Sequence, residues 1–432
     1  MAKPNLALIP AAQGTKLYSV LPSDGSGDFD FTRSSSATRI NAQGLIESVT
    51  NNSSRLNYPL LDGKVVGCPH HILEPQRTNV LLYSESFSQS SWNKTRSSVS
   101  TNNLISPDGT LNADKLVESS DTGFHAISTT ASVTSGVNYT FSIFIKKGST
   151  NFIQILFGTN NVTGNPYVNF DINKGIYQNN GVTSANIENY GNGWYRCSTT
   201  FTTATTSITN FISSIQSISD SRASSFTGNV NNNIYIYGAM LEEGSYPTSY
   251  IKSNSGSATT RLAESATGSG SAATFNDSEG VLMAEISALA NDLTNRQITL
   301  SDGTNDNRLV LKYDNQSNII QSFNRVGGTE TAFLSASITD ITLFSKCLVK
   351  YKVNDYQLWI NGFKLDADTS ASVWASSTLN DLKLNAGGGA DFFGKTKQVQ
   401  YFDTALTDTQ LEELTSWDSF SDMANGQLYT IE

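Results

Sequence analysis

The sequence has few charged residues, and this shortage narrows the class of protein it can encode. Charged residues make up 15 % of its 432 residues, against about 25 % in an average globular protein. Ser, Thr, Asn and Gly take their place, and they favour strands and turns because polar side chains near the backbone compete with helical hydrogen bonds. The formal net charge of -10 argues against a nucleic-acid partner, which requires a basic surface.

Cysteine, histidine and long apolar runs are also scarce. The six cysteines and histidines are Cys68, Cys197, Cys347, His70, His71 and His125. They form no CxxC pair and no ligand or triad spacing, so we expect no disulfide framework, no metal centre, no cofactor and no catalytic residue. No apolar run approaches the roughly 20 residues that cross a bilayer. The N-terminal apolar stretch is too short for a signal peptide, so we expect synthesis in the cytoplasm and no membrane insertion.

Two acidic loops could supply oxygen ligands to a structural calcium ion. One holds Asp24, Asp28 and Asp30, and the other holds Asp302 and Asp306. Neither carries the EF-hand pattern or its terminal bidentate glutamate. Ordinary Asp/Gly turns are therefore the favoured interpretation of both loops.

Period-two alternation of apolar and polar residues predicts an all-β chain. It is clear at 139–145, and similar runs bounded by Gly or Asn clusters follow at 152–157, 167–172, 194–201 and 234–241. A second block of such runs begins after residue 280. There Asn361-Gly362 separates two alternating runs, as a type I′ hairpin requires. Thr407 to Gln410 reads as a capping box that begins a short helix.

The candidates for carbohydrate chemistry are few. Asp366-x-Asp368 has a spacing that could place two carboxylates on one face of a strand, but it follows a hairpin in a polar turn, where solvated carboxylates are the favoured interpretation. Trp374 lies in the polar stretch 369–377, which makes it the best candidate for an exposed aromatic platform. Trp194 and Trp359 lie inside strand patterns and are expected in the core.

Several short motifs resemble virion structural proteins of tailed bacteriophages. They include GDFDFTR at 27–33, LEPQRTN at 73–79 and SYPTSYI at 245–251, with further matches at 4–10, 16–22, 44–47, 55–58, 192–196 and 238–244. The resemblance implies a jelly roll similar to carbohydrate-binding modules. Residues 280–417 are similar to concanavalin A-like, laminin-G-type sandwiches, on the motifs at 358–362, 394–395, 401–402 and 405–407.

The resulting prediction is two antiparallel β-sandwiches in a chain of five parts. The expected parts are an irregular N-terminal attachment segment (1–75), a jelly roll (76–252), a Gly/Ser linker (253–274), a concanavalin A-like sandwich (275–420) and a C-terminal tail (421–432). Glu74 and Arg77, in ILEPQRTNVLLY, are expected to clasp the N-terminal segment to the jelly roll rather than to act in catalysis.

The resemblance implies a non-enzymatic fibre or spike protein of the virion, made in the host cytoplasm and released by lysis. Its expected partners are other virion proteins and a host-surface glycan, the latter bound at Trp374, Asp366 and Asp368 by stacking and hydrogen bonds. A homo-oligomer is expected, with a trimer as one option. The alternatives are a purely structural adaptor or capsid decoration protein and, less favoured because no repeated rungs or paired carboxylates occur, a polysaccharide depolymerase.

Overall fold

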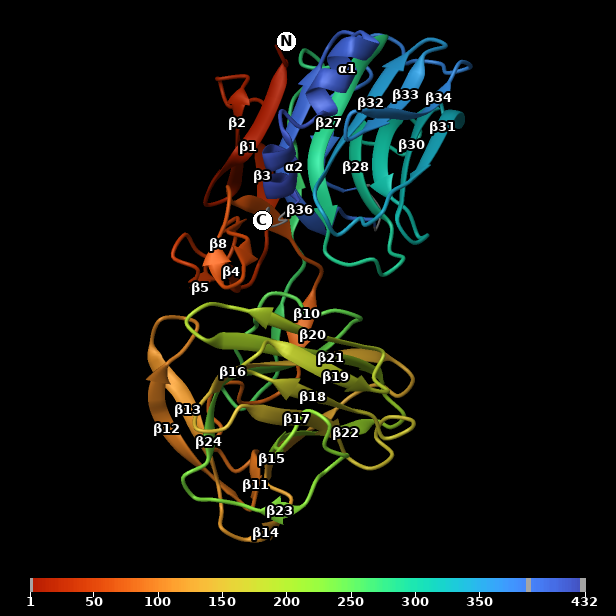
Figure 1. The fold of residues 1–432 in the computed structure, drawn as a ribbon. Helices are drawn as coiled ribbons and strands as arrows, with labels where there is room; N and C mark the ends of the chain where they lie inside the picture. The colour runs from red at the N-terminus through yellow and green to blue at the C-terminus, as the bar shows by residue number, and fades with distance from the viewer. Residues whose placement is uncertain (1–2, 386–389, 428–432) are drawn as a thin grey trace.

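Two large hydrophobic cores divide the protein into two lobes, drawn one above the other in Figure 1. The computed structural model describes residues 3–385 and 390–427. Almost every element in these residues is a β-strand in an antiparallel sheet. The prediction of an all-β protein built from β-sandwiches is confirmed.

The lower lobe is a sandwich of two six-stranded sheets. The first sheet has the order β11 (Asn93–Thr95), β15 (Ala126–Ser132), β22 (Ser207–Ser214), β17 (Phe152–Phe157), β18 (Tyr167–Asp171), β19 (Ile176–Asn180). The second has the order β12 (Ser97–Ile105), β13 (Leu111–Glu118), β24 (Asn233–Glu243), β16 (Asn138–Lys147), β21 (Trp194–Thr202), β20 (Ser184–Asn189). A short ribbon of β14 (Thr122–Gly123) and β23 (Phe226–Thr227) lies at its far end (Figure 1). Phe141, Ile143 and Ile145 of β16 alternate into the core between the sheets, as their period-two spacing predicts.

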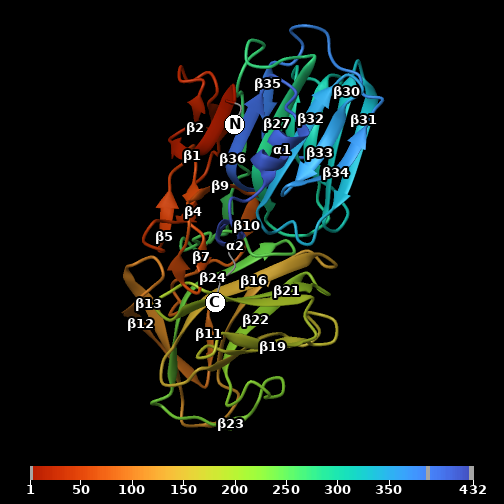
Figure 2. The ribbon, with the colours of Figure 1, turned by 45° about the horizontal axis from the view of Figure 1, so that its top comes forward.

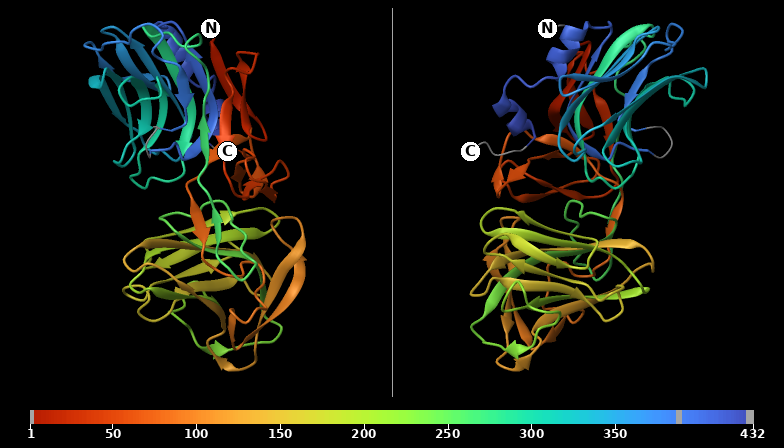
Figure 3. Two further views of the ribbon diagram at one scale, coloured as in Figure 1. Left: turned by 180° about the vertical axis from the view of Figure 1, so that it is seen from behind. Right: turned by 45° about the vertical axis from the view of Figure 1, so that its right-hand side comes forward.

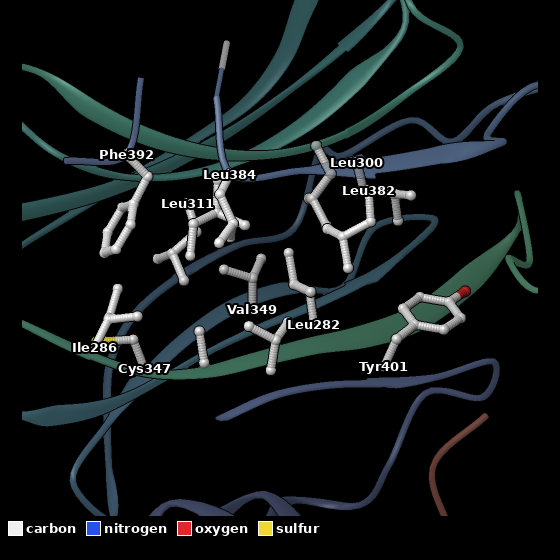
Figure 4. Packing of buried hydrophobic residues seen from close by; sticks show 14 of the residues in the cluster. Leu282, Ile286, Leu300, Leu311, Cys347, Val349, Leu382, Leu384, Phe392 and Tyr401 are labelled. Atoms are coloured by element: carbon white, nitrogen blue, oxygen red, sulfur yellow. The ribbon is translucent and has the colours of Figure 1, made fainter. Parts of the chain in front are cut away.

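The upper lobe places a five-stranded sheet on an eleven-stranded sheet. The five strands are β31 (Thr329–Ser337), β30 (Ile319–Val326), β29 (Arg308–Tyr313), β28 (Arg296–Ser301) and β35 (Asp381–Lys383). The larger sheet runs β26 (Ser265–Thr267), β3 (Phe29–Thr32), β2 (Lys16–Leu21), β1 (Leu6–Gln13), β36 (Gly394–Phe402), β27 (Glu279–Ala288), β32 (Ser345–Lys352), β33 (Tyr356–Ile360), β34 (Phe363–Asp368), with β9 (His70–Leu73) paired to β36 and to β6 (Leu56–Asn57). Figure 4 shows Leu282 and Val349 of one sheet facing Leu300 and Leu311 of the other.

The turn and the helix start predicted for the upper lobe are confirmed. Asn361 and Gly362 join β33 to β34 with φ values of 49° and 88°, the left-handed conformation that a type I′ turn requires. Helix α1 (Asp408–Thr415) begins at Thr407, whose hydroxyl accepts from the Gln410 N–H in a capping box. Helix α2 (Phe420–Gly426) occupies the start of the predicted C-terminal tail, and residues 428–432 of that tail lie outside the described residues.

The expectation of an irregular N-terminal segment is wrong. Residues 1–75 contribute β1, β2, β3, β6 and β9 to the eleven-stranded sheet, and form the small hairpins β4 (Ala37–Ile40) with β5 (Ile46–Val49) and β7 (Leu60–Leu61) with β8 (Lys64–Val65). Leu8 and Phe29 are fully buried in the core of the upper lobe. The segment has too few apolar residues for a core of its own, and it acquires one because β1 pairs with the edge of β36. Figure 2 shows these strands beside the C-terminal sheet.

The predicted Gly/Ser linker is also structured. Its β25 (Thr259–Arg261) pairs with β10 (Arg77–Asn79), and its β26 extends the eleven-stranded sheet. Arg261, Glu264 and Ala266 are buried. The small residues suggested flexibility, but this stretch passes between the lobes as packed, hydrogen-bonded chain (Figure 3).

We predict that truncating a buried side chain in β1 destabilises the upper lobe alone. Leu8→Ala removes a fully buried side chain from that core and should cost about 2–5 kcal/mol. Ile155→Ala in β17 is the matched control, because Ile155 is equally buried in the lower core. Scanning calorimetry should show the two variants lowering two different transitions. A Leu8→Ala variant that lowers the same transition as Ile155→Ala would show that the N-terminal strands belong to the lower lobe.

Candidate functional site

Five buried charged side chains meet where the N-terminal segment, the lower lobe and the connection between the lobes converge. They form what we call the Arg–Glu network: Arg33, Arg55, Glu74, Arg261 and Glu264. Each side chain is at most 2 % exposed. Such charges persist in a protein interior only when they are paired and hydrogen-bonded.

Glu264 is the acceptor that links the two N-terminal arginines. Its Oε1 lies 2.6 Å from Arg33 Nη1 and 2.8 Å from Arg55 Nε, and its Oε2 pairs with Arg55 Nη2. Oε2 also accepts the backbone N–H of Glu74 at 2.8 Å. The carboxylate of Glu264 therefore accepts from three separate positions of the N-terminal segment, Arg33, Arg55 and Glu74.

Glu74 performs the same role toward the lower lobe. Its Oε2 lies 2.8 Å from Arg55 Nη2 and 2.9 Å from Arg261 Nη1, and its Oε1 accepts the Ser249 N–H at 2.8 Å. Burial opposes the ionised carboxyl, but the charges of Arg261 and Arg55 outweigh that effect and lower the pKa of Glu74 to about 2. Glu74 thus stays ionised at all ordinary pH values.

The predicted partner of Glu74 in the clasp, Arg77, lies outside the network. Its Nε is 3.8 Å from Glu242 Oε2, and its guanidinium stacks on Tyr246. Both contacts stay within the lower lobe, and among the described residues Arg77 makes no side-chain hydrogen bond or ion pair with the N-terminal segment. The expectation for Arg77 is therefore corrected, because its place is taken by Arg55 and Arg261. Glu74 does contact the N-terminal segment through Arg55, and we predict that these contacts stabilise the fold.

The predicted glycan platform is wrong in one residue. Trp374 is 5 % exposed, its indole packs edge-on against Tyr351, and its Nε1–H donates to the Arg325 carbonyl at 2.6 Å. A ring inside the core cannot stack on a sugar. Asp366 accepts the Ser335 N–H at 2.9 Å, and Asp368 accepts both the N–H and the hydroxyl of Ser370 at 2.7 Å. Trp374 has polar neighbours in the sequence, which suggested exposure, but its side chain points into the core.

No grouping of three or more His, Cys, Asp or Glu residues that could hold a metal ion occurs within the described part of the chain. Nor do the helices there include one long and apolar enough to span a membrane. The adjacent His70 and His71 are both buried. Burial, with the nearby charges of Lys395 and Lys397, holds the pKa of His70 well below its usual range, so this imidazole is neutral at neutral pH.

A cleft of about 510 Å³ opens beside the Arg–Glu network, and we call it the junction cleft. Its walls come from the N-terminal segment, from the β20–β21 region of the lower lobe and from the upper lobe. Its aromatic lining residues are Tyr58, Phe144, Tyr190, Tyr195, Tyr246, Tyr250 and Phe344. Glu74 and Ser249 belong both to the cleft and to the hydrogen bonds of the network. This volume lies within the range of about 300–1,000 Å³ that small-molecule sites occupy.

The backbone of the β7–β8 hairpin closes one side of the cleft. Gly63, with φ of 74°, lies against Gly191 of the lower lobe, and a Cβ on Gly63 would sit 2.5 Å from the Gly191 backbone. Only glycine permits this approach. The tip of the hairpin and the 189–193 turn are thereby held together at the edge of the cleft.

Polar groups with unused bonding capacity face the cleft. Lys395 of β36 and Glu188 of β20 both line it, and neither side chain makes a hydrogen bond or an ion pair with another described residue. Burial lowers the pKa of Lys395, and the carboxylates of Glu188 and Glu74 act against that shift. The ammonium and the carboxylate come from different lobes. Together with the tyrosine rings they offer a donor, an acceptor and stacking faces to one ligand.

The sequence predicted one lining residue of this site, Glu74, and missed the rest. The cleft draws on residues 38–62, 174–196 and 344–395, which no local pattern connects. Asn57-Tyr58 and Asn189-Tyr190 are the one signal that could have marked it, since paired amide and aromatic residues in polar turns suit sugar recognition. That signal has no meaning without the long-range contacts.

Comparison with known proteins identifies no family. No family model and no curated protein matches the sequence. Among solved structures, the chain is similar to the CBM40 domain of the Ruminococcus gnavus IT-sialidase bound to α2,3-sialyllactose, with 15 % identity over 33 % of this chain and 84 % of that one and a TM-score of 0.29. It is also similar to domain 4 of AbnA, a GH43 extracellular arabinanase from Geobacillus stearothermophilus, in complex with arabinotriose. The identity is 10 % over 36 % of this chain and 73 % of that one, with a TM-score of 0.30.

A third similarity is to the receptor-binding domain of botulinum neurotoxin C/D mosaic serotype, with 12 % identity over 35 % of this chain and 40 % of that one and a TM-score of 0.29. Each similarity is weak and covers about a third of the chain. None of them establishes a ligand for this protein.

We predict that Glu74→Gln destabilises the protein in a pH-dependent way. At pH 7 the loss should be about 3–5 kcal/mol, because Arg55 and Arg261 keep their charge without a full counter-charge. The folded pKa of about 2 lies below the ordinary value of 4.5, so the stability that ionised Glu74 contributes is full above pH 4.5 and declines as the pH falls toward 2. That contribution is on the order of 3 kcal/mol.

Urea unfolding at pH 7 and at pH 3 measures this difference between the wild-type protein and the variant. The gap should shrink at pH 3. Glu413→Gln, on the exposed face of α1, is the matched control and should show almost no gap at either pH. A gap for Glu74→Gln that stays constant or widens at pH 3 would contradict the assignment of an ionised, arginine-paired Glu74.

Proposed function

We propose that this chain is a non-catalytic, saccharide-binding structural protein of a bacteriophage virion, of the fibre or spike type. The junction cleft carries the saccharide-binding part of the proposal. Sugars are held by aromatic faces that stack on the ring and by amide, carboxylate or ammonium groups that bind hydroxyls. The cleft combines tyrosine rings with Asn57, Asn189, Glu188 and Lys395 in one volume of suitable size.

The virion part of the proposal is supported by the resemblance of the sequence motifs. Arg33, Arg55, Glu74 and Ser249 each lie inside a motif that resembles phage virion proteins. Glu74 accepts from Arg55 and from Ser249, and Arg33 joins them because it shares the acceptor Glu264 with Arg55. The same proposal implies other virion proteins and a host-surface glycan as partners, a homo-oligomeric particle component, and release by lysis.

A role for Glu74 as the catalytic acid of a glycosidase is disfavoured by its electrostatics. Glycoside hydrolysis needs one carboxylic acid whose pKa is raised, so that it can protonate the leaving oxygen. Glu74 has the opposite shift, because Arg261 and Arg55 hold its pKa at about 2. The second candidate function is therefore an adaptor or capsid decoration protein, which would use the same sandwiches to contact virion proteins.

We predict that side chains lining the cleft control saccharide binding and do not control folding. Tyr58→Ala should weaken binding about two- to tenfold through loss of a stacking face, and Tyr58→Phe should bind nearly as the wild type. Glu188→Gln combined with Lys395→Gln should weaken binding by a similar factor. Melting temperatures should stay close to wild type, since neither charged side chain makes a hydrogen bond or an ion pair with another residue that the structure describes.

The measurement is a glycan array with the intact protein, followed by calorimetric titration of the best saccharide. Lys115→Gln combined with Glu413→Gln is the matched control, because it makes the same charge changes away from the cleft. Equal binding by the cleft variants and the control would remove the cleft from the proposal. Absence of any bound saccharide, with antibody labelling of the chain on intact particles, would favour the adaptor.

A further inference from the structure

Two arginines without an acidic partner flank one phenylalanine on the five-stranded sheet of the upper lobe. Arg308 of β29 lies directly opposite Arg325 of β30 in the strand register. The Phe323 ring lies beneath both, 5.2 Å from the guanidinium carbon of Arg308 and 5.9 Å from that of Arg325. Leu309 and Leu311 point into the core, so alternation places the two arginines on the outer face of the sheet.

This arrangement concentrates positive charge that the protein itself does not neutralise. Like charges directly opposite each other destabilise an antiparallel pair. Neither guanidinium lies within ion-pairing distance of a carboxylate of the described residues, and the one side-chain bond from Arg308 goes to the neutral Asn305 at 2.9 Å. The pKa of Arg308 is lowered by burial and then by the charge of Arg325, with no carboxylate acting against them.

The acidic residues near these arginines form no ion pair with them within the described chain. Asp302 binds Thr304 and Asn307, both through hydrogen bonds shorter than 3 Å. Glu330, the register partner of Arg325 on β31, is exposed and forms no ion pair with it. The charge of the arginine pair is therefore available to a ligand.

Buried polar atoms at and near the pair also lack a partner within the described chain. The Nε–H groups of Arg308 and Arg325 are buried and have no partner in the described chain, and the same holds for the hydroxyl of Thr299. Thr299 is opposite Val310, which is in turn opposite Phe323, so these three residues form one row across the sheet. Phe333, opposite Phe323 on β31, is 46 % exposed and extends the row with an apolar face.

We propose that Arg308 and Arg325 form a second binding site, which recognises an oxyanion carried by a saccharide, such as the carboxylate of a uronic acid or a sulfate ester. Guanidinium groups bind planar or tetrahedral oxyanions through paired, charge-assisted hydrogen bonds. Phe323 packs against both guanidinium groups, and Phe333 offers a face to the sugar that carries the anion. The site is on the upper lobe and is separate from the junction cleft.

The test measures binding of the intact protein to dextran sulfate and to uncharged dextran of the same length. The wild type should bind dextran sulfate and bind uncharged dextran at least tenfold more weakly. Arg308→Gln combined with Arg325→Gln should lose dextran sulfate binding at least tenfold. Its melting temperature should stay equal or rise, because the substitution removes a repulsion. If the arginine pair served only to stabilise the fold, the double substitution would lower the melting temperature instead.

The matched control is Lys312→Gln together with Lys383→Gln, which removes two positive charges from the same sheet. Lys312 is paired with Asp314 at 2.8 Å and Lys383 with Asp381 at 2.8 Å, so neither ammonium is spare. This control should bind within about twofold of wild type. Equal losses in both double variants would show non-specific charge attraction and overturn the proposal, as would unchanged binding by the arginine variant.

A further experiment distinguishes a free anion from one carried by a sugar, and distinguishes the arginine site from the junction cleft. Inorganic sulfate and an oligogalacturonate are tested as competitors of dextran sulfate, each against the neutral methyl-esterified oligogalacturonate. They distinguish a bare oxyanion from one carried by a sugar. Competition by inorganic sulfate at the same potency as the oligogalacturonate would overturn the saccharide part of the proposal. Tyr58→Ala in the junction cleft should leave dextran sulfate binding unchanged. The inference can therefore fail while the cleft proposal stands, and the reverse.

Discussion

The buried pairing of three arginines with two glutamates is the interaction on which the rest of this structure depends. Removing charged groups from water is expensive, and the mutual attraction of the groups offsets that expense only when geometry and hydrogen bonding are close to ideal. Here Glu74 and Glu264 accept from Arg33, Arg55 and Arg261 and from two backbone N–H groups. A displaced segment would leave buried charges unpaired, so the network specifies one relative placement of its segments.

That placement explains the architecture of both lobes. Glu74 follows β9, which pairs with β36, and it precedes β10, which pairs with β25. Glu264 lies between β25 and β26 in the connection back to the upper lobe. The network therefore lies at the crossing of the chain between the lobes, and the junction cleft forms beside it because the N-terminal hairpins are held against the 189–193 turn.

Short-range signals in the sequence predicted much of the fold. The elements that depend on long-range strand pairing could not be predicted from it. Asn361-Gly362 and Thr407 define a turn and a helix start through neighbouring atoms alone, so the sequence suffices for them. Leu8 and Phe29 are core residues only because β1 adds to the edge of a sheet almost 400 residues away in the chain. Trp374 failed as a predicted platform for the same reason, since Tyr351 receives its ring.

The candidate site was still less predictable. Glu74 was recognisable as a clasp residue because the proline after it places it in extended chain. Its partners Arg55 and Arg261 are 19 and 187 residues away in the sequence. No local pattern shows which donors a buried carboxylate will bind. The cleft draws its rings from three regions, and the pair of Arg308 and Arg325 becomes visible only through strand register.

Hydrogen exchange of the intact protein carrying Glu264→Gln tests the central claim most directly. This substitution leaves Arg33 and Arg55 short of their shared acceptor. We predict faster exchange in β4 to β9, in β25 and β26 and at the cleft, while the amides of β16 and β17 in the lower core keep their protection. Unchanged exchange in the N-terminal strands, or loss of protection spread evenly over both lobes, would contradict it.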